Sequence, residues 1–170
     1  MTERVLRLVG NRRLRDEDVP AHERDEIERN GREAGELAAE KGWRELRREL
    51  DRSRRFGHDF SLLRMPRVVP DGNGGTDLAR SLPVRLRSID TVWGDRRYAF
   101  VLLPEADRDV ALALVARLRR ETPGLIPRDV RLAAFPEDGV TGGALIELLD
   151  ERAPLADQLD VALQQGLAGA

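Results

Sequence analysis

The chain has 170 residues, of which 41% are apolar and 35% charged, and its 29 basic and 31 acidic side chains leave a formal net charge of −2. This length and composition suit one domain of ordinary size, and the near-neutral charge gives no general attraction for nucleic acid or an anionic membrane. Because the chain has no cysteine, no apolar run of roughly 18 residues and no signal-peptide pattern, disulfides and membrane insertion are excluded and we expect a cytoplasmic protein.

The first 55 residues are strongly polar and divide into an arm and a helical segment. Residues 1–20 alternate basic and acidic side chains, which indicates a flexible arm. Residues 21–55 hold good helix formers with one apolar stripe, but three glycines predict a break into two helices. The stripe comprises Ile27, Ala34, Leu37, Ala38, Trp43, Leu46 and Leu50. Two interpretations stay open, a solvated helix with one packed stripe and a dimerisation helix.

Four short apolar runs bounded by turn residues predict strands. They are Phe60–Met65, Thr91–Trp93, Tyr98–Leu103 and Val130–Ala134. The glycine-rich stretch "PDGNGG" between the first two lacks the GK[ST] ending of a phosphate-binding loop, so we interpret it as a turn.

Helices are predicted between and after these strands. We expect Thr76 to cap a helix that Pro83 kinks or divides. A second helix begins near Asp107, and its amphipathic pattern predicts that Leu114 is buried. Thr141 caps a third helix. A last helix with a Gly/Ala tail is expected over residues 154–170, with apolar positions Leu155, Leu159, Ala162 and Leu163.

The order of these elements predicts the fold class. Strands separated by helices, with one hairpin in the middle, favour an α/β (α+β) fold in which a mixed central sheet is flanked by helices.

The sequence contains few patterns that are typical of catalytic residues. His22 and His58 stand alone without metal-ligand spacing, and neither a G-x-S-x-G elbow nor a dinucleotide G-x-G-x-x-G occurs. Residue types alone therefore indicate no reaction.

Four stretches between Leu37 and Asp150 resemble, in order and near the expected spacing, the GGDEF domain, which has the diguanylate cyclase fold. They are "GWRELRRELDRSRRFGHDFSLL", "LARSLPVRLRSID", "YAFVLLPEADRDVALALVARLR" and "VRLAAFPEDGVTGGALIELL". The resemblance implies a nucleotide-cyclase-like domain over residues 37–150 with an N-terminal helical extension. It also implies a role in bacterial signalling by cyclic di-GMP.

The signature that gives the family its activity is degenerate in this chain. Its five positions fall on residues 95–99, "DRRYA", where the family has paired glycines for the triphosphate and carboxylates for metal. The central strand ends in "RMPR", where the family places a metal-binding Asp. Two-metal phosphoryl transfer needs carboxylates on both elements, and only Asp95 is left. We therefore expect no enzymatic activity, no catalytic residue, no metal and no cofactor.

The family also has an R-x-x-D motif, a few residues before the signature, that binds cyclic di-GMP. Arg87 to Asp90, "RSID", occupies that place. Arginine can form paired hydrogen bonds to phosphate or guanine, and a carboxylate can accept from guanine N–H groups. The resemblance implies a ligand site at Arg87 and Asp90, to which we add Arg96, Arg97 and Arg64 as candidates.

The same spacing occurs elsewhere, so position alone distinguishes this motif. The other matches are Arg13–Asp16, Arg15–Asp18 and Arg48–Asp51. The alternative is an Arg–Asp pair that merely closes a helix.

Two functions follow as expectations. The first is an effector that binds cyclic di-GMP and passes the signal to an unidentified protein partner. The second is a protein-interaction or homodimerisation module that keeps the fold and binds no nucleotide. An enzyme acting on another nucleotide is the weakest alternative.

Overall fold

The computed structural model describes residues 8–9, 12–13, 21–72 and 74–156. Strands β1 (Leu8–Val9) and β2 (Arg12–Arg13) form a short antiparallel pair. The rest of the predicted arm lies outside the described residues, as does the predicted last helix beyond Ala156.

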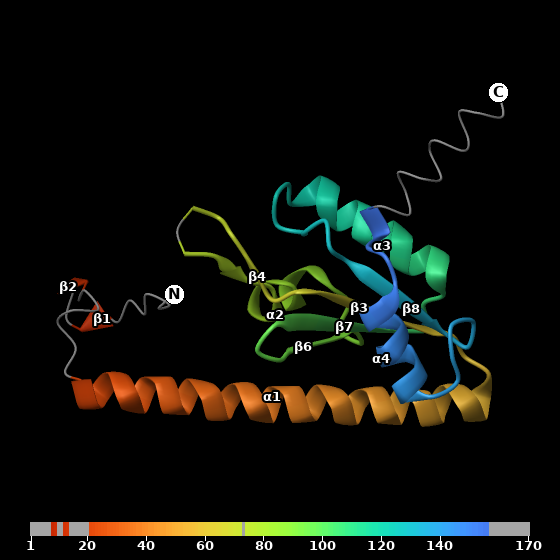
Figure 1. The fold of residues 1–170 in the computed structure, drawn as a ribbon, viewed down its shortest axis with the longest axis horizontal. Helices are drawn as coiled ribbons and strands as arrows, with labels where there is room; N and C mark the ends of the chain where they lie inside the picture. The colour runs from red at the N-terminus through yellow and green to blue at the C-terminus, as the bar shows by residue number, and fades with distance from the viewer. Residues whose placement is uncertain (1–7, 10–11, 14–20, 73, 157–170) are drawn as a thin grey trace.

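Helix α1 (Ala21–Phe56) is one continuous helix of 36 residues, whereas its glycines predict two. One of these glycines has a packing role, because a side chain at Gly42 would overlap the indole of Trp93. The helix ends at Gly57, which adopts the left-handed conformation (φ 71°) and donates its N–H to the carbonyl of Ser53 at 2.8 Å. Glycine is favoured at this position because it has no Cβ to clash. In Figure 1 the N-terminal part of α1 extends beyond the sheet.

The central sheet has four strands in the order β6-β7-β3-β8. Their bounds are Phe60–Pro66 for β3, Thr91–Gly94 for β6, Tyr98–Pro104 for β7 and Arg131–Phe135 for β8. The α+β class is confirmed. Every pairing in this sheet is antiparallel, whereas the alternation of strands and helices predicts a mixed sheet. The reason is the strand order: α3 joins β7 to β8, but β3 lies between these two strands and pairs antiparallel with both.

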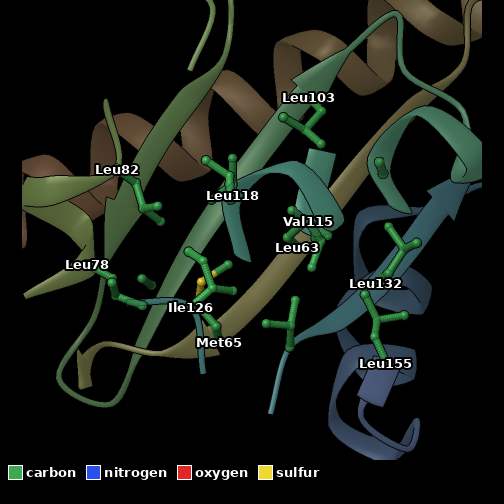
Figure 2. Close-up of a cluster of buried hydrophobic side chains, with 14 of the residues drawn as sticks. Leu63, Met65, Leu78, Leu82, Leu103, Val115, Leu118, Ile126, Leu132 and Leu155 are labelled. Carbon is green, nitrogen blue, oxygen red and sulfur yellow. The ribbon is translucent and has the colours of Figure 1, made fainter. Parts of the chain in front are cut away.

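Helices cover both faces of the sheet. Helices α2 (Leu78–Ser81) and α3 (Arg108–Glu121) pack on one face, while α1 and α4 (Gly142–Glu151) pack on the other. Figure 2 shows the first of these cores, where β3 contributes Leu63 and Met65. Because β3 is buried on both faces, apolar residues occupy successive positions such as Leu62 and Leu63 instead of alternating with polar ones.

The elements from β3 to β8 follow the β-α-β-β-α-β order of a split β-α-β fold. Between β3 and α2, strands β4 (Val68–Val69) and β5 (Thr76–Asp77) pair across the glycine-rich turn. The cap of α2 is Asp77, which accepts from the N–H of Ala79, and not Thr76 as predicted, because Thr76 belongs to β5. Pro83 divides the predicted helix and begins the 3-10 turn η2 (Pro83–Arg85), as expected.

Helix α3 begins after Asp107, whose carboxylate accepts from the N–H of Val110 at 2.9 Å. Its buried stripe is Ala111, Val115 and Leu118. The prediction that Leu114 is buried is wrong, because Leu114 lies at the edge of this stripe and is only partly covered. Thr141 caps α4 as predicted. No helix in the described ranges has both the length and the apolar character to span a membrane.

Candidate functional site

Asp95, Arg96 and Arg97 form the tight turn between β6 and β7. One carboxylate oxygen of Asp95 accepts hydrogen bonds from the backbone N–H groups of Arg97 and Tyr98, both at 2.7 Å. The N–H of Asp95 in turn donates to the carbonyl of Tyr98 at 2.9 Å. Asp95 therefore shapes the hairpin turn, which is the usual role of an Asp side chain that bonds the backbone two residues on.

Arg67 connects the end of β3 to this turn and to α2. Its Nη2 donates to the carboxylate of Asp77 at 2.8 Å, and its Nη1 donates to the backbone carbonyl of Asp95 at 2.7 Å. The backbone N–H of Arg67 also donates to the carbonyl of Arg97 at 2.8 Å. The Arg67–Asp77 pair is mostly shielded from solvent. Sequence reasoning missed the role of Asp77, because the nine residues between the partners look like an ordinary turn.

This arrangement places the guanidinium of Arg67 between the hairpin turn and the carboxylate of Asp77. A guanidinium repels a divalent metal ion, and Asp77 is already neutralised by it. Strand β6 and helix α2 also pack closely here, because a Cβ at Gly94 would lie 3.1 Å from the Cβ of Ala79 and 3.2 Å from the carbonyl oxygen of Tyr98. Within the part of the chain that the structure describes, no three His, Asp or Glu side chains form a group that could hold a metal ion.

Arg87 and Asp90 lie at the other end of the hairpin and bind each other. The backbone N–H of Arg87 donates to one oxygen of Asp90 at 2.9 Å, and its Nη2 donates to the other at 2.9 Å. The same Nη2 reaches the carbonyl of Pro104 at 3.1 Å. The Asp90 side chain is 1% exposed, whereas that of Arg87 is 48% exposed. Asp90 thus holds the guanidinium of Arg87 in place at the surface, and its own carboxylate does not face solvent.

The five predicted ligand residues fall at three separate places. Arg96 and Arg97 are exposed at the hairpin tip, and Asp90 and Asp95 are five extended residues apart, roughly 17 Å at 3.4 Å per residue. Arg64 lies in the middle of β3, is almost completely buried, and forms an ion pair with Asp150 of α4. Its guanidinium carbon is 4.3 Å from the centre of the Tyr98 ring. The structure therefore brings Arg87 and Asp90 together but not the other three with them.

A second buried carboxylate, Asp138, was missed by the sequence reasoning. It accepts from the backbone N–H of Ala134 at 2.7 Å, from Arg152 at 2.8 Å and from Arg108. Burial alone raises the pKa of Asp138, but these hydrogen bonds and the two positive charges outweigh it and lower the pKa below its ordinary value. Asp138 therefore joins the turn after β8 to the start of α3 and the end of α4. The Pro-x-Asp-Gly pattern of this turn was the available signal.

The chain matches no family model, no curated protein and no solved structure. The resemblance to the GGDEF domain therefore rests on the four sequence stretches that carry it.

Proposed function

We propose that the chain is a non-catalytic, GGDEF-like module that acts through protein contact, and that it self-associates through the N-terminal part of α1. The observation that carries this proposal is the exposure of Ala34, Leu37 and Ala38 on α1. At 1.5 Å per residue α1 is about 54 Å long, and the α1 residues whose burial the structure describes contact the hydrophobic core from Ala39 onward. The α1 residues in that core are Ala39, Trp43, Leu46 and Leu50.

The exposed part of α1 carries an apolar stripe that a second copy could cover. Leu37 is 70% exposed, and Ala34 and Ala38 on the same side are exposed as well. A helix without packing is only marginally stable in water, since most helical stability comes from an apolar face buried against another element. Pairing of two α1 helices would bury this stripe in a symmetric dimer, in which the same surface serves both copies.

The contacts at the hairpin tip support the proposal that the module is non-catalytic. A cyclase of this family would need carboxylates at the end of β3 and in the turn between β6 and β7. Arg67 is at the first place, and Asp95 at the second is committed to the backbone of the turn. We expect no conversion of GTP to cyclic di-GMP with magnesium or manganese.

Light scattering after size-exclusion chromatography tests the dimer. The chain should elute at twice its mass of 19.1 kDa, and Leu37→Glu should shift it toward the monomer because it places two charges in the helix pair. Val84→Glu is the matched control, since Val84 is 81% exposed on η2 and away from α1. If both variants behave alike, the stripe on α1 is not the contact.

Binding of cyclic di-GMP is the second candidate function, and the geometry of Arg87 favours it. Its guanidinium is half exposed and fixed by a buried carboxylate, so little conformational entropy is lost when it binds an anion. In this arrangement Asp90 positions Arg87 and does not contact guanine. The positive charge and the planar donors suit a phosphate or the guanine edge.

Calorimetric titration with cyclic di-GMP separates the two candidates. If the effector function holds, Arg87→Ala should weaken binding by about tenfold to a hundredfold, as expected for one charge-assisted contact of about 1.5–3 kcal/mol. Arg48→Ala is the matched control, because Arg48 has the same R-x-x-D spacing but pairs with Glu45 on α1. No heat of binding with the parent chain would leave protein contact as the only function.

A further inference from the structure

A groove of about 610 Å³ runs along α3, on the face of the sheet opposite to α1 (Figure 1). Val115 of α3 and Leu155, both labelled in Figure 2, are almost completely buried and form its apolar floor. Leu112 is half-buried, and Ala113 and Ala116 are exposed along its walls. The groove is therefore apolar over most of its length and open to solvent.

Two arginines bring positive charge to the C-terminal end of this groove. Arg119 and Arg120 both line it, and within the described part of the chain neither has a carboxylate partner. Nη2 of Arg119 donates to the backbone carbonyl of Pro127 at 3.1 Å, which fixes the guanidinium in place. Partial burial and the nearby charge of Arg128 lower the pKa of Arg119, although an arginine stays protonated at neutral pH. An anion beside Arg119 would therefore be stabilised by an uncompensated positive charge.

The dimensions of the groove favour a small ligand over a helix of another protein. From Leu112 to Ala116 the apolar wall follows α3 for about 6 Å, at 1.5 Å per residue. A docked helix needs apolar anchors over about two turns, which is longer than this wall. The volume and the mostly apolar lining with a few charged groups are instead typical of sites for small molecules.

We propose that the α3 groove binds an anionic amphiphile with a single alkyl chain, such as a fatty acid, as a free molecule in solution. The alkyl chain lies over Val115, Ala116 and Leu155, and the carboxylate of the ligand accepts hydrogen bonds from Arg119 and Arg120. This site and the proposed dimer contact on α1 are on opposite faces of the sheet, so neither proposal depends on the other.

Calorimetric titration of the full chain with three probes tests the site. Decanoate carries both the alkyl chain and the negative charge, acetate lacks the chain, and decyltrimethylammonium has the same chain with a positive charge. All three are used at concentrations at which they form no micelles. Decanoate should bind once per chain, and each of the other two should bind at least about tenfold more weakly, because each lacks one of the two complementary parts.

Substitutions then assign the binding to the groove. Arg120→Gln and Arg119→Gln should each weaken decanoate binding by about tenfold. Their matched control is Arg117→Gln, because Arg117 is an exposed arginine of α3 that donates to the carbonyl of Arg85 and does not line the groove. Ala116→Trp should abolish binding by filling the groove. Its control is Val110→Trp, at a 47% exposed position on α3 outside the groove. Circular dichroism confirms that every variant is folded.

Three results would overturn the proposal. If the parent chain gives no heat with decanoate, the groove takes no free amphiphile, whether because another part of the chain or a second copy covers it. Equal binding of decanoate and decyltrimethylammonium shows that the arginines recognise no anion. If Ala116→Trp binds decanoate as the parent does, the ligand lies elsewhere. Sedimentation with phosphatidylglycerol vesicles distinguishes the other source of such a ligand, because binding to vesicles without binding of decanoate assigns the arginines to a lipid surface and also overturns the proposal.

Discussion

Replacement of Gly42 by alanine tests how α1 is fixed to the sheet. An added Cβ would lie 2.2 Å from two ring atoms of Trp93 and 2.7 Å from its Cβ. The indole has no room to move away, because it is 2% exposed, stacks on Phe100 at 5.4 Å and meets the edge of Trp43 at 5.2 Å. One of the two packed elements must therefore shift.

The size of the effect follows from two opposing contributions. Alanine is a better helix former than glycine by about 1 kcal/mol, which favours the variant. Overpacking of a rigid core costs typically 1–3 kcal/mol, and a contact this short belongs at about 3 kcal/mol. The net loss is about 2 kcal/mol, which corresponds to a fall in melting temperature of roughly 4–8 °C for a chain of this size.

Gly35→Ala on the same helix is the control. A Cβ at Gly35 meets nothing within 4 Å, so only the gain in helix propensity of about 1 kcal/mol applies and the variant should be more stable than the parent. Thermal unfolding followed by circular dichroism measures both. The reasoning is refuted if Gly42→Ala melts at or above the parent. In a Trp93→Ala background the two overlapping ring atoms are removed, so the loss caused by Gly42→Ala should be smaller, and a double-mutant cycle measures that coupling.

Two further stability predictions concern the core. Asp138→Asn should cost about 2–3 kcal/mol in denaturant unfolding, less than for fully buried pairs because Arg108 and Arg152 are partly exposed. Since the pKa of Asp138 is lowered in the fold, its contribution is complete above the unfolded value of about 3.9 and is lost as the pH falls through the folded value. The variant should therefore be less sensitive than the parent to acid below about pH 4, and an identical acid transition would contradict the assignment. Leu118→Ala should cost about 2–5 kcal/mol and Leu114→Ala about 1–2 kcal/mol, and equal losses in urea unfolding would show that Leu114 is buried after all.

The strands and α3 could be predicted well because each is formed by consecutive residues whose apolar pattern is visible in the sequence. The runs at Phe60–Met65 and Tyr98–Leu103 match β3 and β7 almost to the residue. The antiparallel order of the sheet could not be predicted in the same way, since it depends on β3 lying between β7 and β8. The continuous helix α1 was also not predicted. Helix propensities count Gly42 as a helix breaker and do not include the close contact that it makes with Trp93.

For the candidate ligand residues, the sequence predicted their positions in the fold only in part. The R-x-x-D spacing located Arg87 and Asp90, and the structure places them in contact. Their pairing with each other was one of the two interpretations left open by the sequence, because the spacing alone does not distinguish an Arg–Asp pair from two groups that are free to bind a ligand. Arg64 is a charged residue within an apolar strand, and the sequence does not show its partner because Asp150 is 86 residues away. Interactions of that range are set by the tertiary structure and leave no local signal.

The molar mass of the unaltered chain across a range of concentrations is the most direct test of self-association through α1. Light scattering should give a mass that rises from 19.1 kDa in dilute solution to twice that value in concentrated solution, and the Leu37→Glu variant should stay at the lower mass. A parent chain that keeps the mass of a single copy at every concentration would contradict the proposed dimer.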